Sequence, residues 1–271
     1  MNKKAISNIA WEMADDTRIQ DLLKQFDFHG IEIAPTKIWP DLSEVTAADA
    51  DRCRESWEDA GFRIVAMQSI LYGKPELTLF ESEEARIATI AYHRKVFAIA
   101  HELGVKKIVF GSPKNRRIPL GMSREEANSL AYEVFTQLAD YSGAYGIYLC
   151  IEANPERYGG NYITKTAEAL ALVQRVNHPY LRLHLDTGEL YLTNEPIRET
   201  IRQSLPFVKH VHVSEPDLDP IGTHALPHQE IAACLREGNY TEWISIEMRP
   251  DPSDSKLVRI RSSLAQVAKL Y

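Results

Sequence analysis

Short apolar runs and longer segments of helical periodicity alternate along the whole chain. The short runs are rich in aliphatic and β-branched residues, as expected for parallel strands that are buried on both faces. Eight runs are predicted to be strands, at 5–11, 30–35, 63–69, 106–113, 147–155, 181–188, 208–216 and 242–248. Their regular alternation with helical segments predicts repeated βα units around a parallel sheet.

The clearest helical segment follows the fourth predicted strand. Ser123 and Glu126 have the spacing of a capping box, and apolar residues then recur at the i, i+3, i+4 and i+7 positions of one helix face. A second clear helix is predicted over 83–103. Weaker signals predict a short helix capped by Asn194 and a last helix over 253–271.

The number of repeating units points to one architecture. Eight strands and eight helices in 271 residues predict an α/β fold made of a single (β/α)8 barrel, the TIM barrel, spanning residues 1–271 as one domain. No linker or change of composition divides the chain. A doubly wound open sheet is the alternative, but the first βα turn lacks a GxGxxG motif and the chain has no Walker A motif.

Charge and cysteine content narrow the class of protein. The chain has 31 Lys+Arg against 38 Asp+Glu, a formal net charge of −7, and its basic residues are scattered. This balance predicts no nucleic-acid partner. The three cysteines are far apart and form no CxxC motif, which suits a reducing compartment. With neither a signal peptide nor a long apolar run in view, we expect a cytoplasmic protein with no membrane partner.

The last four predicted strands each end near a side chain that can bind a metal ion. These side chains are Glu152, Asp186, His212 and Glu247, spaced by about one βα unit. Each could be the first solvated residue after a strand, but the shared register favours convergence at the C-terminal face of the barrel. Buried carboxylates need a neutralising cation or protons. Three carboxylates and an imidazole favour one divalent ion such as Mn²⁺, Mg²⁺ or Co²⁺.

Four segments resemble a known family over the whole chain: IEANPERYGGNYIT at 151–164, LRLHLDTGEL at 181–190, HVHVSEPDLDPIG at 210–222 and WISIEM at 243–248. The family is the xylose-isomerase-like barrel superfamily of sugar isomerases and sugar-phosphate isomerases and epimerases. The resemblance implies that Glu152, Asp186, His212 and Glu247 are the metal ligands. It also implies that Glu152 and Glu247 are the catalytic acid and base.

Two positions depart from the pattern of many sugar epimerases in this family. Glu189 stands where they have a histidine, and the segment 214–217, Ser-Glu-Pro-Asp, stands where they have an arginine. We therefore expect substrate contacts that differ from those of the familiar ketose epimerases. The loss of both positions that can carry a positive charge argues against a phosphorylated or carboxylated substrate bound there.

Further residues near the strand ends are candidates for substrate binding, each with a surface or packing role as the alternative. The candidates are Trp11, Glu12, Gln68, Asn154, Glu189 and His224. Trp11 offers an aromatic face for a sugar ring, and Asn154 resembles a position that supports the substrate or the metal-bound glutamate in relatives.

Other polar residues have weaker assignments. Glu32, at the end of the second strand, fits a site residue and a surface residue equally well. His184 and His210 are expected to be buried and hydrogen-bonded one layer beneath the site. The basic run at 114–117 is expected to be a solvated loop, with anion binding as the alternative, and His93 is expected at the surface.

These features predict a divalent-metal-dependent isomerase or epimerase of a keto sugar or sugar derivative. The reaction would proceed through an enediolate, with protons transferred by Glu152 and Glu247. A metal-dependent lyase or dehydratase on the same barrel is the main alternative. An abasic-site endonuclease and a binding protein are weaker ones. The expected partner is a small sugar, and the sequence leaves a homo-oligomer open.

Overall fold

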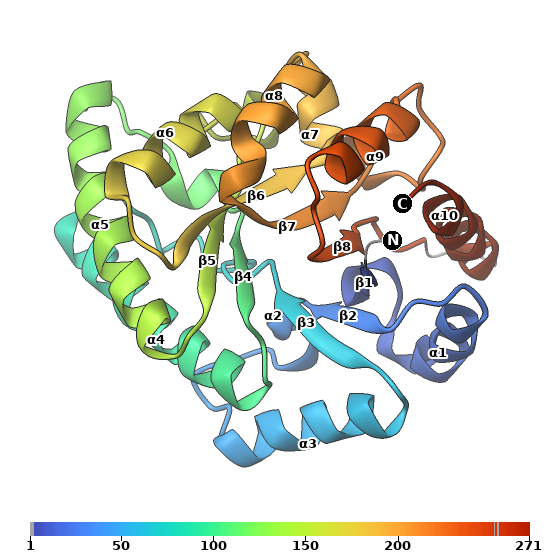
Figure 1. The fold of residues 1–271 in the computed structure, drawn as a ribbon. Helices are drawn as coiled ribbons and strands as arrows, with labels where there is room; N and C mark the ends of the chain where they lie inside the picture. Colours follow the sequence, from blue (N-terminus) through green and yellow to red (C-terminus); the bar gives the residue numbers. More distant parts are fainter. Residues whose placement is uncertain (1–2, 252, 254) are drawn as a thin grey trace.

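The computed structural model describes residues 3–251, 253 and 255–271. Its eight parallel strands form a closed barrel in which each strand pairs with the next and β8 pairs with β1 (Figure 1). The predicted (β/α)8 fold is therefore confirmed. The strands are β1 (Lys3–Ser7), β2 (Gly30–Ile33), β3 (Arg63–Met67), β4 (Lys107–Phe110), β5 (Tyr148–Ile151), β6 (Leu181–Asp186), β7 (Val208–Val213) and β8 (Trp243–Ile246).

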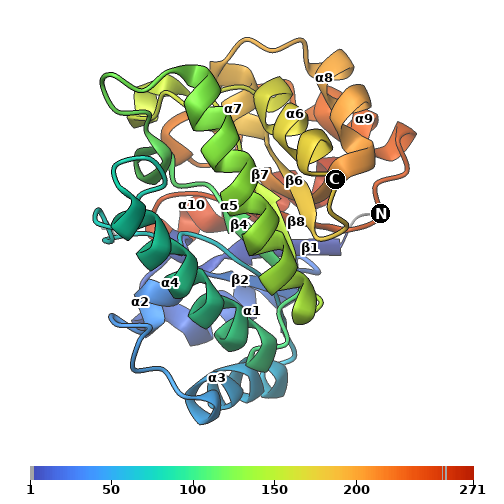
Figure 2. The same cartoon turned by 90° about the vertical axis from the view of Figure 1, so that its left-hand side faces the viewer.

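Helices surround the barrel, and the two longest, α4 and α5, lie side by side on its outside (Figure 2). The described part of the chain has ten α-helices: α1 (Asp16–Gln25), α2 (Pro35–Ile38), α3 (Ala47–Asp59), α4 (Glu83–Glu102), α5 (Arg124–Ala144), α6 (Thr166–Val176), α7 (Thr187–Leu192), α8 (Ile197–Ser204), α9 (His228–Glu237) and α10 (Lys256–Leu270). None of the helices within these described ranges is long and apolar enough to cross a membrane.

The count of eight helices was wrong by two, because α2 and α7 are short extra helices directly after β2 and β6. α2 begins at Pro35, whose fixed φ suits the first turn of a helix. α7 begins after Asp186, whose carboxylate accepts a hydrogen bond from the main-chain nitrogen of Glu189 at 2.8 Å. Both helices are shorter than the window in which helical periodicity can be recognised.

One of the helix starts predicted at Ser123, Asn194 and residue 253 agrees with the structure, and two do not. The capping box of Ser123 and Glu126 is confirmed at the start of α5. Asn194 does not cap α8: it has a left-handed backbone with φ of 52°, and the N-cap is Pro196. The last helix begins at Lys256 and not at 253; residue 254 lies outside the described residues.

The alternation of side chains in the strands separates the core from the interior of the barrel. Leu181, Leu183 and Leu185 of β6 are buried in the continuous hydrophobic core that the strands share with the helices. Their neighbours His184 and Asp186 instead approach Glu152, directly after β5, and His212 of β7. The predicted parity is confirmed, and it directs the polar residues toward the C-terminal mouth of the barrel.

Candidate metal centre and active site

A cavity of about 740 Å³ lies at the C-terminal ends of the strands. The carboxylates of Glu152, Asp186 and Glu247 line it, together with the loops at 68–75 and 111–115. Glu152 and Glu247 follow β5 and β8 directly, and Asp186 is the last residue of β6. The barrel thus brings these acids to the face where barrel enzymes carry their active sites.

His212, near the end of β7, has its imidazole surrounded by these three carboxylates. Its Nδ1 lies 3.3 Å from Glu247 Oε2, 3.6 Å from Glu152 Oε1 and 3.8 Å from Asp186 Oδ2. This Nδ1 is buried and has no partner in hydrogen-bond geometry among the described residues. All three predicted carboxylate ligands therefore approach His212 Nδ1, but the side chains whose ligand atoms lie within 4.8 Å of one another are Glu152, His184, Asp186 and His212, and do not include Glu247.

Glu32, from β2, orients the His212 ring from the opposite side. It is fully buried, with Oε2 2.9 Å from His212 Nε2 and Oε1 3.0 Å from His210 Nε2. A proton on Nε2 that is donated to Glu32 leaves the lone pair of Nδ1 facing the three carboxylates. A carboxylate behind a histidine is the usual support of a metal-ligating imidazole. Glu32, which the sequence left undecided between a site and a surface residue, is thus a buried residue that contacts a candidate ligand.

The ionisation of the cluster agrees with a site for a cation. Burial and the charges of Glu152 and Glu247 raise the pKa of Asp186, and burial likewise raises the pKa of Glu247. Burial opposes the charge on His212, but Glu32 and Glu247 outweigh it and raise the pKa of that imidazole. The crowding of negative charge that favours the neutral forms of Asp186 and Glu247 is the effect that a divalent cation would offset. Three carboxylates and one imidazole without a thiolate suit a hard divalent ion.

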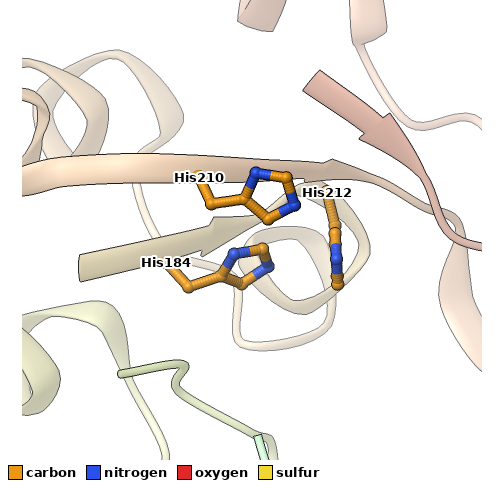
Figure 3. A group of neighbouring side chains, drawn as sticks. All are labelled: His184, His210 and His212. Carbon is orange, nitrogen blue, oxygen red and sulfur yellow. The ribbon is translucent and has the colours of Figure 1, made fainter. Parts of the chain in front are cut away.

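Three histidines, His184, His210 and His212, lie beside one another on β6 and β7 (Figure 3). The rings of His184 and His212 meet edge to face with their centroids 4.0 Å apart. His184 and His210 are buried as predicted, but of the two only His210 is hydrogen-bonded; the prediction was wrong for His184, whose two ring nitrogens have no hydrogen-bond partner among the described residues. Burial lowers the pKa of His184 to about 3, so its imidazole is neutral. His184 Nε2 lies 3.1 Å from Glu152 Oε1, without hydrogen-bond geometry. His184 is therefore a further candidate ligand, grouped with Glu152, Asp186 and His212.

Three of the predicted substrate-binding residues line the cavity: Gln68, Asn154 and Glu189. Asn154 Nδ2 donates a hydrogen bond to Glu152 Oε2 at 3.1 Å and a second one to Glu189 Oε1. Burial, together with the charge of Glu152, raises the pKa of Glu189. Asn154 is thus shared between two carboxylates, one of which is a candidate ligand.

The other three predicted substrate-binding residues, Trp11, Glu12 and His224, do not line this cavity. Trp11 is buried in a separate depression, where its Nε1 donates to Asp16 Oδ1 at 2.6 Å, and Glu12 is exposed. β1 ends at Ser7, so a 3₁₀ turn carries the chain away from the mouth before these two residues. His224 is exposed in the loop before α9 and pairs with an aspartate there.

Three positively charged side chains line the cavity at positions other than the two that depart from the family pattern, Glu189 and 214–217. Lys74, Lys114 and Arg249 line it from the loops after β3, β4 and β8. Arg249 also pairs with Asp219 at 2.5 Å. The argument from the two missing cations therefore applies to those two positions only, and other parts of the cavity wall carry positive charge.

Two expectations about surface residues were wrong. Lys114 and Arg117 of the basic run are exposed as predicted, but Arg116 is fully buried. His93 is fully buried inside α4, where its Nδ1 lies 2.7 Å from the carbonyl oxygen of Thr89. The burial of Arg116 and His93 could not be predicted, because the sequence around an arginine in a loop or a histidine in a helix does not show what packs against it.

The sequence matches the family model of the xylose isomerase-like TIM barrel over residues 20–266. It is 27% identical over 238 residues to the D-psicose 3-epimerase of Agrobacterium fabrum strain C58, covering 84% of this chain and 81% of that protein. It is 30% identical over 132 residues to the L-ribulose 3-epimerase of Methylomonas sp. strain DH-1, covering 48% and 45% of the two chains.

A solved structure supports the same architecture. The crystal structure of D-psicose 3-epimerase in the presence of D-fructose superposes with a TM-score of 0.81 at 21% identity, covering 99% of both chains. At this identity the likeness concerns the fold. The two curated relatives are sugar epimerases, the enzyme class that the sequence predicted, and they do not favour the lyase, endonuclease or binding-protein alternatives. The chain belongs to the xylose isomerase-like TIM barrel family.

Proposed function

We propose that the protein is a divalent-metal-dependent epimerase that inverts the carbon next to the carbonyl group of a keto sugar. The observation that carries the proposal is the approach of Glu152, Asp186 and Glu247 to His212 Nδ1 within 3.3 to 3.8 Å. The names of the relatives, D-psicose and L-ribulose 3-epimerase, support inversion at C3.

The metal ligands in this proposal are Glu152, Asp186, His212 and Glu247, with Glu32 holding the imidazole from behind. A bound Mn²⁺, Mg²⁺ or Co²⁺ ion supplies Lewis acidity, which polarises a carbonyl and stabilises negative charge on neighbouring oxygens. Ser214 Oγ donates its one proton to the Asp186 carboxylate, whose two oxygens lie 2.7 and 2.8 Å away, and this contact holds the carboxylate in place.

The two glutamates perform the proton transfers. One carboxylate removes the proton from the carbon next to the carbonyl, which leaves an enediolate, and the other returns a proton to the opposite face of that carbon. Glu152 and Glu247 follow β5 and β8, which are three positions apart in a ring of eight strands. They therefore reach the substrate from different directions, as inversion requires.

The test is whether the metal-loaded protein converts a ketose into its C3 epimer. D-psicose, L-ribulose and related ketoses would each be incubated with the protein and the products separated by chromatography. We expect interconversion of at least one C3 pair. A dehydrated product would favour the lyase alternative, and no conversion of any ketose by metal-loaded protein would contradict the proposal.

Gly111 is the first residue after β4, and because it has no side chain there is room beside it for the Glu152 carboxylate. A Cβ at this position would collide with Glu152 Oε2. Gly111 has no positive φ, so alanine can adopt its backbone and the collision is the main effect. We expect Gly111→Ala to lower kcat on the order of 10²-fold by displacing a reacting group. Measured kcat and Tm would check this, and wild-type kcat in the folded variant would show that Glu152 can move without loss.

A further inference from the structure

Arg116 is a fully buried arginine at the end of the 3₁₀ turn that follows β4. Burial lowers the pKa of Arg116 to about 10, so its guanidinium remains charged at neutral pH. Its hydrogen bonds go to the carbonyl oxygens of Phe110, Glu152, Tyr162 and Ile163, at 2.7 to 3.4 Å, and to Asn154 Oδ1 at 2.7 Å. A buried charge is costly unless it is well bonded, so the fold around Arg116 is built to hold it.

Arg116 contacts the segment that carries Glu152 at two points. Its Nη2 donates to the main-chain oxygen of Glu152 at 2.7 Å, and the same nitrogen donates to Asn154 Oδ1 at 2.7 Å. Because Arg116 can only donate, the oxygen of the Asn154 amide must face it. The amide nitrogen then points toward Glu152 Oε2, 3.1 Å away, and toward Glu189.

The reverse orientation of this amide is disfavoured on both sides. It would place Asn154 Oδ1 against the Glu152 carboxylate, and its NH₂ group against the guanidinium of Arg116. Arg116 therefore determines which way Asn154 faces, and Asn154 in turn holds one oxygen of Glu152 while the other, Oε1, faces His212.

We propose that Arg116 is a positioning residue that fixes the Glu152 carboxylate through the Asn154 amide. The inference rests on the proposed function for its effect on turnover, but its effect on metal binding can be measured without a substrate. Arg116 itself acts from behind β5. Its loss is expected to loosen Glu152 both as a ligand and as a proton carrier.

The test compares Arg116→Met, Asn154→Ala and the double variant. Removal of a group that supports a metal ligand typically costs 10- to 100-fold. We expect each single variant to weaken metal binding and lower kcat by about that much, with KM changed far less. If Arg116 acts through Asn154, the double variant should be no worse than the worse single variant.

Arg117→Met is the matched control, because Arg117 is exposed and bonds the Gly159 carbonyl oxygen at 3.3 Å. Its metal affinity and kcat should equal those of the wild type. If Arg116→Met does not fold, the same comparison of single and double variants can be made with Arg116→Lys and Asn154→Ala. The lysine variant should keep part of the metal affinity, because lysine retains a positively charged donor at this position.

Additive losses in the double variant, or a lowered Tm with normal metal affinity and kcat, would overturn the inference and leave Arg116 as a core residue. These outcomes are separate from a failure of the proposed function. If the wild-type protein epimerised none of the ketoses, the metal titrations of the same variants would still decide whether Arg116 positions Glu152.

Discussion

Glu152→Gln and Glu247→Gln are each expected to lower kcat by at least ~10²-fold, the usual loss when a general base is removed. Glutamine keeps the size of the side chain but cannot accept the substrate proton. The change also replaces one charged oxygen ligand close to His212 Nδ1. Both effects act on the reacting centre, so kcat should fall more than KM rises.

Metal content must be measured in the same variants, because loss of the ion would mimic loss of the base. Turnover is therefore compared at saturating metal. Glu199→Gln is a matched control, since Glu199 is an exposed glutamate on α8 that pairs with Arg202. It should retain wild-type kcat. More than half of wild-type turnover in either active-site variant would rule out the two-glutamate mechanism.

Removal of the ion or of one ligand should abolish turnover. Exhaustive dialysis against EDTA is expected to leave no measurable activity, and Mn²⁺, Mg²⁺ or Co²⁺ should restore it. His212→Ala and Asp186→Ala should each bind far less metal, because each removes one of four ligands. The wild type should gain thermal stability when metal is added, since only the folded chain presents the site.

Elemental analysis of the dialysed proteins checks this second prediction. His29→Ala is the control, because His29 is exposed beside Asp27 and lies outside the barrel cavity. It should bind as much metal as the wild type. Full activity after exhaustive EDTA dialysis, with no metal in the sample, would exclude the metal-dependent mechanism.

The barrel could be predicted because local patterns determine it. Each strand shows its buried aliphatic positions in the sequence, and residues such as Asp186 and His212 share the parity that directs them inward. Four candidate ligands could be selected because they recur at the same place in successive βα units. The repetition can be recognised in the sequence without knowledge of any contact between distant residues.

The rest of the site depends on contacts that no local pattern reveals. Glu32 reaches His210 and His212 across the barrel, and its one available signal was a lone acid inside the apolar run of β2. The sequence shows Arg116 as part of a basic loop, although the turn at 113–116 brings it against the main chain of Glu152, just after β5. The prediction that Trp11 binds the substrate failed for a similar reason: the turn after β1 carries Trp11 away from the mouth of the barrel, and the sequence does not show the direction of that turn.

The most direct measurement follows solvent deuterium into the product. The metal-loaded protein would be incubated in D₂O with the ketose that it epimerises, and the early product would be examined by NMR and mass spectrometry. Because the proton returned to the inverted carbon comes from a carboxylate that exchanges with water, we predict one deuterium at that carbon from the first turnovers. Early product that retains its original hydrogen there would contradict proton transfer by Glu152 and Glu247 and would indicate another route of inversion.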